Sequence, residues 1–168
     1  MTDLYLVRHG ETVDNANKIM QGQTQGELNA RGIEQARTVA GNLADEPFDA
    51  VVSSDLKRSF DTASIIAEPH GLKVFTTPLL RERDWGSFTG KYIPDLKDKE
   101  WPDDIESLDA LKRRATEFLN YIRTTFPDQR VIAVGHGIIN KAIQSVYFDK
   151  PMNEIQKMTN AEIRILEL

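Results

Sequence analysis

Short apolar runs alternate along this chain with longer segments whose apolar residues recur at helical spacing. A short apolar run bounded by polar or turn residues is typical of a buried strand. We expect strands at 3–8, 50–53, 73–76, 131–134 and 161–167. Because the run at 131–134 is apolar throughout, it is expected near the centre of the sheet.

The segments between these runs predict amphipathic helices. Asn29 is a suitable N-cap for a first helix, which Pro47 ends. Further helices are expected over 55–68, over 107–126 and from Gly137 to about Tyr147. The apolar residues expected on the buried helix faces are Ile33, Ala36, Ala40, Leu43, Leu56, Phe60, Ala63, Ala67, Leu108, Leu111, Ala115, Leu119, Ile122 and Phe126.

Strands that alternate with helices predict the α/β class, as a three-layer α/β/α sandwich with a mostly parallel central sheet. No repeat or linker interrupts the chain, so we expect one domain over 1–168. Residues 9–28 form a long polar loop without periodicity, and such loops in compact domains are usually functional or disordered. A second irregular stretch contains a short insertion at about 83–106.

Composition narrows the classes of function. The chain has 168 residues, of which 40% are hydrophobic, and a net charge of −5. It has no cysteine, which excludes a disulfide framework, a thiolate zinc site and a cysteine nucleophile. The acidic balance argues against a nucleic-acid-binding surface. No run approaches the ~20 apolar residues of a membrane span, and the first residues do not resemble a signal peptide, so we expect a cytoplasmic protein.

Two of the three histidines occupy similar places in the pattern. His9 and His136 each follow a predicted strand, and each is followed by a glycine. Because ligands of open α/β sheets bind beyond the carboxyl ends of the strands, the two histidines are expected to meet there. Either one alone is equally compatible with a hydrogen-bonded structural residue. Neither has a second ligand at paired spacing, so no metal is expected.

Arg8 and Arg58 are candidate phosphate ligands, because a guanidinium group binds two phosphate oxygens with its planar fork. Arg8 ends an apolar strand, where a charge needs a partner or an anion. Spacing alone favours a surface helix residue for Arg58. An anionic substrate in this acidic protein would require a local concentration of cations.

The segment Leu6-Val7-Arg8-His9-Gly10-Glu11-Thr12 resembles the signature of the histidine phosphatase superfamily, also called the phosphoglycerate mutase-like family. The resemblance continues in the family's order over nearly the whole chain. The further matching positions and blocks are Asn15, Gln21, Gly22, 28–36, 53–63, 80–86 and 134–137.

This resemblance implies a role for each matching residue. His9 would attack phosphorus and become a phosphohistidine. Arg8, Arg58 and a protonated His136 would hold the phosphoryl oxygens, without a metal or other cofactor. Glu82 would donate a proton to the leaving oxygen and later help to activate water.

Other residues are assigned less directly. Asn15, Gln21 and Gly22 would contribute to phosphate or substrate binding. By its local sequence alone, Glu82 also fits a solvated ion-pair partner, and Asp84 is then a second candidate acid. Trp85 and Trp101 fit either a pocket lining or ordinary packing.

Hydrolysis is favoured over mutase action. The stretch from Lys91 to Ser107, where mutases typically carry a long basic insertion, is short, has no arginine, and contains more acidic residues than its three lysines. Arg83 is still expected to contact a substrate anion. We therefore expect a phosphomonoester hydrolase for a small phosphorylated metabolite, as a monomer or homodimer. The alternatives are a phosphoglycerate mutase and a phosphoryl-binding module without turnover, although a binder would not need both a nucleophile and an acid.

Overall fold

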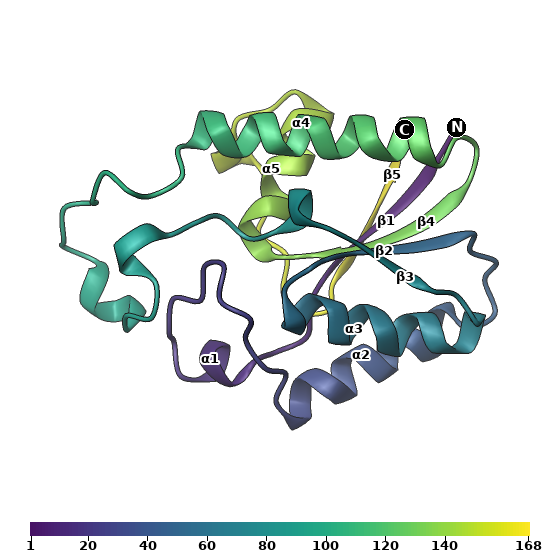
Figure 1. The fold of residues 1–168 in the computed structure, drawn as a ribbon, viewed down its shortest axis with the longest axis horizontal. Helices are drawn as coiled ribbons and strands as arrows, with labels where there is room; N and C mark the ends of the chain where they lie inside the picture. The colour runs from purple at the N-terminus through teal and green to yellow at the C-terminus, as the bar shows by residue number, and fades with distance from the viewer.

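A computed structural model describes all residues from Met1 to Leu168. Its centre is a five-stranded sheet of order β3-β2-β4-β1-β5 (Figure 1). The strands are β1 (Asp3–Arg8), β2 (Ala50–Ser54), β3 (Val74–Thr77), β4 (Arg130–Gly135) and β5 (Ile163–Glu167). The first four are parallel, and β5 runs antiparallel to β1. The apolar run at 131–134 lies in the middle strand, as its composition predicts.

Helices cover both faces of this sheet. Figure 1 shows α2 (Ala30–Leu43) and α3 (Lys57–Ala67) on one side, and α4 (Leu108–Thr125) and α5 (Gly137–Phe148) on the other. Successive residues of β1 point to opposite faces, so Leu4 and Leu6 join the core under α4 and α5, while Tyr5 and Val7 join the core under α2 and α3. The expected three-layer sandwich is confirmed.

Short helices lie in the connecting segments. The loop at 9–28 contains α1 (Val13–Ala16), whose N-terminus is closed by a capping box between Thr12 and Asn15. The insertion at 83–106 has no α-helix or β-strand. The 3₁₀ segments are η1 (Glu68–His70), η2 (Pro78–Leu80), η3 (Gly86–Phe88), η4 (Ile93–Leu96) and η5 (Met152–Glu154).

Three details of the expected helices are wrong. α3 begins at Lys57, and Asp55 lies before it as an ion-pair partner of Arg81 at 2.6 Å. Phe60 is 39% exposed because the face of α3 that packs inward is the one that carries Ser59, Thr62 and Ile66. Leu108 is 45% exposed at the first position of α4.

The register of the sheet places the two histidines side by side. Arg8 at the end of β1 pairs with Gly135 at the end of β4, and His9 and His136 follow directly. The backbone N–H of His9 donates to the carbonyl of Gly135 at 3.1 Å. The carboxyl edge of the two central strands is therefore where the predicted site is assembled.

The backbone after His9 passes directly against the first turn of α2. A Cβ on Gly10 would lie 2.5 Å from the carbonyl oxygen of Gly32. A Cβ on Gly32 would lie 2.0 Å from the carbonyl oxygen of Glu11. Only glycine permits this approach. The helix therefore supports the loop that carries His9.

We predict that Gly32→Ala destabilises the protein by about 2–3 kcal/mol, because the added methyl meets rigid backbone. Gly41→Ala is the matched control in the same helix, since a Cβ there has no atom within 4 Å. That control should gain up to ~1 kcal/mol from its higher helix propensity. Urea unfolding followed by circular dichroism measures both, and equal stability of the two variants would contradict the close contact.

Candidate active site

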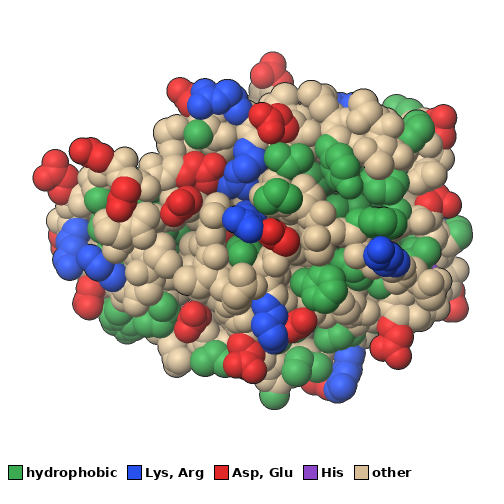
Figure 2. Space-filling view, viewed as in Figure 1, with side chains coloured by type: hydrophobic (Ala, Val, Ile, Leu, Met, Phe, Trp, Pro, Cys, Tyr) green, Lys and Arg blue, Asp and Glu red, His purple; other side chains and the backbone are tan.

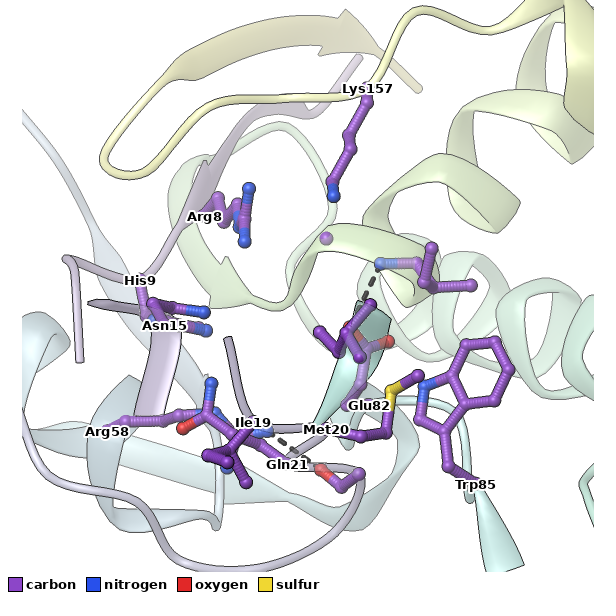
Figure 3. A pocket seen from close by; sticks show the side chains of 14 residues that line it. Arg8, His9, Asn15, Ile19, Met20, Gln21, Arg58, Glu82, Trp85 and Lys157 are labelled. Carbon is purple, nitrogen blue, oxygen red and sulfur yellow. Dashed lines mark hydrogen bonds between the residues drawn. The ribbon is translucent and has the colours of Figure 1, made fainter. Parts of the chain in front are cut away.

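A pocket of about 240 Å³ opens beyond the carboxyl ends of β1 and β4 (Figure 3). Its floor is polar and its rim carries several apolar side chains. The lining residues are Arg8, His9, Asn15, Ile19, Met20, Gln21, Gly22, Arg58, Glu82, Trp85, Ile93, Gly137, Ile138 and Lys157.

His9 lies at the base of this pocket and is 2% exposed. Its Nδ1 is 2.6 Å from the carbonyl oxygen of Gly10, so Nδ1 carries the proton and Nε2 keeps a free electron pair. Burial, together with the charges of Arg58 and Arg8, holds the pKa of His9 well below its usual range. A neutral imidazole with a free Nε2 is a competent nucleophile.

His136 is fully buried beside His9, with the ring centroids 5.1 Å apart. Its Nε2 lies 2.9 Å from Ser54 Oγ and 3.2 Å from Ser59 Oγ. Ser59 Oγ can donate to the carbonyl of Gly135 at 3.2 Å, which leaves the Ser54 hydroxyl to donate to Nε2. We assign the proton of His136 to Nδ1, which is buried and has no hydrogen-bond partner in the protein.

The expectation of a protonated His136 is not supported for the pocket before phosphate binds. Burial lowers the pKa of His136 well below its usual range, and the charges of Arg58 and Arg8 lower it further. The neutral ring still presents one N–H donor, at Nδ1.

The two arginines present donors that the protein does not satisfy. Arg8 donates from Nη1 to the carbonyl of Met158 at 2.7 Å. Arg58 donates to the carbonyls of Gly22, at 2.7 Å, and Thr24. In both side chains Nε is buried without a partner. Because buried donors are almost always bonded, these atoms indicate an acceptor supplied by a ligand.

Arg58 is 1% exposed and so is no surface residue, contrary to what its spacing favours. Burial lowers the pKa of its guanidinium to about 10, which still leaves it charged at neutral pH. Arg8 and Arg58 approach the pocket from two different segments of the chain (Figure 3).

The predicted binding residues Asn15, Gln21 and Gly22 all line the pocket. Asn15 Oδ1 accepts from the Thr12 N–H at 3.1 Å, so its amide N–H groups are turned the other way. The Asn15 side chain lies next to His9 in Figure 3. Gln21 Oε1 accepts from the Thr12 hydroxyl at 3.0 Å, and Gly22 supplies the carbonyl that holds Arg58.

Glu82 lies on the opposite side of the pocket from His9 (Figure 3). Its carboxylate accepts backbone N–H groups of Ile138, at 3.1 Å, and Ile139, at 3.0 Å, in the first turn of α5, and of Arg83 at 2.8 Å. Arg114 donates to the carbonyls of Arg81 and Glu82 and holds this segment in place. A carboxyl group is thus fixed across the pocket from the histidine.

Arg83 is not brought to the pocket. It is 7% exposed, and its Nε donates to the carbonyl of Glu106 at 2.8 Å. Its guanidinium lies 4.9 Å from the ring centroid of Trp85 and 5.2 Å from that of Trp101. The sequence shows that position 83 carries a cation. It does not show which way the Arg83 side chain points, because that direction depends on packing against distant segments.

Lys157 lines the pocket and was not identified from the sequence. Figure 3 shows its amine directed toward the pocket from the segment that precedes β5. Partial loss of hydration and the charge of Arg8 lower the pKa of Lys157. Its neighbours in sequence carry no motif, so only the fold reveals it.

The charges of the pocket are unbalanced in favour of cations. Arg8, Arg58 and Lys157 face a single carboxylate, Glu82, although the chain as a whole has a net charge of −5. No three His, Asp or Glu side chains converge as they would around a metal ion. No helix has both the length and the apolar character required to cross a bilayer.

A buried histidine with a free nitrogen, fixed cationic donors and an opposed carboxyl define a phosphoryl-transfer site on an α/β sandwich. The sequence matches the histidine phosphatase superfamily (branch 1) over residues 4–168. The chain belongs to this family, and it is a histidine phosphatase. The phosphoglycerate mutase-like fold and the enzyme class expected from the sequence are confirmed.

Similar proteins include several phosphatases. The metal-independent phosphoserine phosphatase of Arabidopsis thaliana is 35% identical over 185 residues, which cover 100% of this chain and 77% of the relative. The structure of mycobacterial glucosyl-3-phosphoglycerate phosphatase with VO3 has a TM-score of 0.89 and 28% identity, covering 98% of this chain and 90% of that one. The structure of YhfR of Bacillus stearothermophilus has a TM-score of 0.92 and 26% identity. The match covers 100% of this chain and 92% of YhfR.

We predict that folding stability falls as the pH drops below about 6.5, because the pKa of both pocket histidines is lower in the folded than in the unfolded chain. The unfolded state then binds more protons, and each histidine contributes a slope of up to about 1.4 kcal/mol per pH unit. Urea unfolding at pH 7.5 and 5.5 measures the loss. The double variant His9→Asn, His136→Asn should lose less stability over this interval, and an equal loss would show that the folded histidines accept protons.

Proposed function

We propose that this protein hydrolyses small phosphate monoesters through a phosphohistidine formed on His9. The observation that carries the proposal is the unprotonated Nε2 of His9 beside two arginines, each with a buried Nε donor that has no partner in the protein. A phosphoryl group supplies the acceptors for those donors and the electrophile for that nitrogen. The phosphatases among the similar proteins support the same reaction class.

In the first step, Nε2 of His9 attacks phosphorus as the bond to the ester oxygen breaks. Arg8, Arg58 and the Nδ1–H of His136 bind the phosphoryl oxygens, where charge is spread in the transition state, and the amide of Asn15 assists. Glu82, across the pocket, lies on the side from which an in-line leaving group departs, and donates a proton to its oxygen.

In the second step, water attacks the phosphohistidine and the P–N bond breaks. Glu82, now a carboxylate, accepts the proton that water loses. Inorganic phosphate leaves and His9 regains its neutral form. All the groups assigned to the reaction come from one chain, so the proposal requires neither a metal nor a partner subunit, whether the protein is a monomer or a homodimer.

Hydrolysis fits the pocket better than mutase action. A mutase must bind a substrate that carries a second anion and keep it while the phosphoryl group is exchanged. Arg83, the basic residue expected to serve that purpose, faces Trp85 and Trp101. A pure binding module would need neither the free Nε2 of His9 nor the opposed Glu82.

We place the enzyme in the cytoplasm, acting on small molecules without nucleic acid, on the basis of its acidic charge and lack of cysteine.

We predict that His9→Ala lowers kcat for p-nitrophenyl phosphate by at least ~1,000-fold, because covalent catalysis is lost. The assay is run in excess chelator, and a ³²P-labelled substrate should leave an acid-labile, base-stable label on the wild-type protein only. His70→Ala, at a remote turn, is the control. Interconversion of 2- and 3-phosphoglycerate would instead identify a mutase, and binding of vanadate without turnover of any ester would identify a binding module.

We predict that Glu82→Gln impairs hydrolysis of alkyl phosphates far more than that of p-nitrophenyl phosphate. An alkoxide needs a proton to leave, whereas p-nitrophenolate does not, so the loss should be about 10²–10⁴-fold for the alkyl ester and below about tenfold for the aryl ester. Asp84→Asn is the matched control and should change neither rate. The opposite pattern would assign the acid to Asp84.

A further inference from the structure

An apolar groove of about 510 Å³ adjoins the phosphate pocket. One wall is formed by the loop around Met20, and the other by the insertion at 83–106. The apolar side chains that line it include Met20, Trp85, Phe88, Ile93, Leu96 and Trp101. The proposed hydrolysis uses none of this surface.

The groove and the phosphate pocket lie side by side and share three lining residues, Met20, Trp85 and Ile93. Figure 3 shows Glu82, Met20 and Trp85 together on the side opposite His9. In an in-line displacement the leaving group departs on the side away from the nucleophile. The substituent on the leaving oxygen is therefore directed past Glu82 toward these apolar side chains.

The two walls are tied together by the backbone. Met20 N–H donates to the carbonyl of Lys91 at 2.9 Å, Gly90 N–H donates to the carbonyl of Met20 at 2.7 Å, and Ile93 N–H donates to the carbonyl of Lys18 at 2.8 Å. These bonds fix the width of the groove. A preformed apolar cleft next to a few polar groups is the usual form of a small-molecule site.

The aromatic side of the groove is supported from within the insertion. The rings of Trp85 and Trp101 meet edge to face at 5.4 Å, and the buried guanidinium of Arg83 lies against both. Even so, Trp101 is 53% exposed and Ile93 is 45% exposed. This apolar surface stays in contact with water until a ligand covers it, and covering it is favourable.

Charge also selects the ligand. Figure 2 shows acidic side chains and some basic ones around the outer edge of the insertion, and apolar ones gathered on its lower side. The insertion's acidic residues do not line the groove, whose only charged lining residues are Lys18 and Lys97. The groove therefore disfavours a cationic substituent.

We propose that the preferred substrates are phosphate esters of large apolar alcohols, aromatic ones in particular, whose hydrocarbon portion binds in this groove. The proposal rests on the proposed hydrolysis at His9. It implies that phosphoserine and 3-phosphoglycerate, whose leaving groups are small and polar, are poor substrates of this chain. Arg83 then acts as a positioning residue for the two tryptophans rather than as an anion ligand.

The test compares 2-phenylethyl phosphate with ethyl phosphate and phosphoserine. The first two esters have alkyl leaving oxygens of similar reactivity, so they differ chiefly in apolar size. We expect kcat/KM for 2-phenylethyl phosphate to exceed that for ethyl phosphate and for phosphoserine by about tenfold or more. Equal values, with all activity lost in His9→Ala, would overturn the groove proposal and leave the phosphatase intact. No His9-dependent turnover of any ester would instead overturn the proposed function.

Variants localise the effect. Trp101→Ala should remove most of the advantage of 2-phenylethyl phosphate through a higher KM for that ester, whereas Trp101→Phe should retain part of the advantage. Phe75→Ala is the control, because Phe75 is a similarly exposed aromatic residue on β3, outside the groove. Thermal unfolding verifies that each variant is folded. An advantage that survives in folded Trp101→Ala, or that falls equally in Phe75→Ala, would contradict the assignment.

Discussion

The parallel pairing of β1 with β4 is the constraint on which the site depends. It sets Arg8 opposite Gly135, so the chain leaves both strands at the same height and two histidines from distant parts of the sequence come into contact. Glycine at positions 10 and 32 then allows α2 to pack against the departing backbone. A slip in this register would separate His9 from His136 and turn the adjacent core residues to the wrong face.

The electrostatics of the pocket follow from the same close assembly. Placing the buried Arg58 and the half-buried Arg8 beside two histidines leaves the imidazoles neutral and the guanidinium groups incompletely bonded. Such a pocket is unfavourable for folding on its own, since polar groups lose water without gaining full partners. The cost is offset when a dianion binds. The folded protein without ligand is therefore less stable than it could be. In return it has a local cationic pocket suited to phosphate, although its overall charge would repel phosphate.

Much of this arrangement follows from the sequence. Apolar runs and helical spacing predict the strands, the four long helices and the layers, because burial on two faces dictates those patterns. His9 and His136 each directly follow a predicted strand, and this placement predicts that they meet at the same edge of the sheet. Arg58 required the family resemblance, since its burial depends on the carbonyls of a loop more than 30 residues away. Arg83 and Lys157 show the limit of pattern analysis: the first points away from the pocket and the second points into it, because of contacts between distant segments.

The unsatisfied donors of Arg8 and Arg58 have a consequence for turnover. In the reaction proposed above they bind phosphoryl oxygens, and inorganic phosphate carries the same oxygens as the ester from which it is released. On these proposals the pocket binds its product through the same contacts that bind its substrate, while the groove contributes affinity only to the intact ester and the free alcohol. Inorganic phosphate is therefore expected to inhibit the enzyme by competing with the substrate. Esters with large apolar groups should compete with phosphate best, because only they gain affinity from the groove.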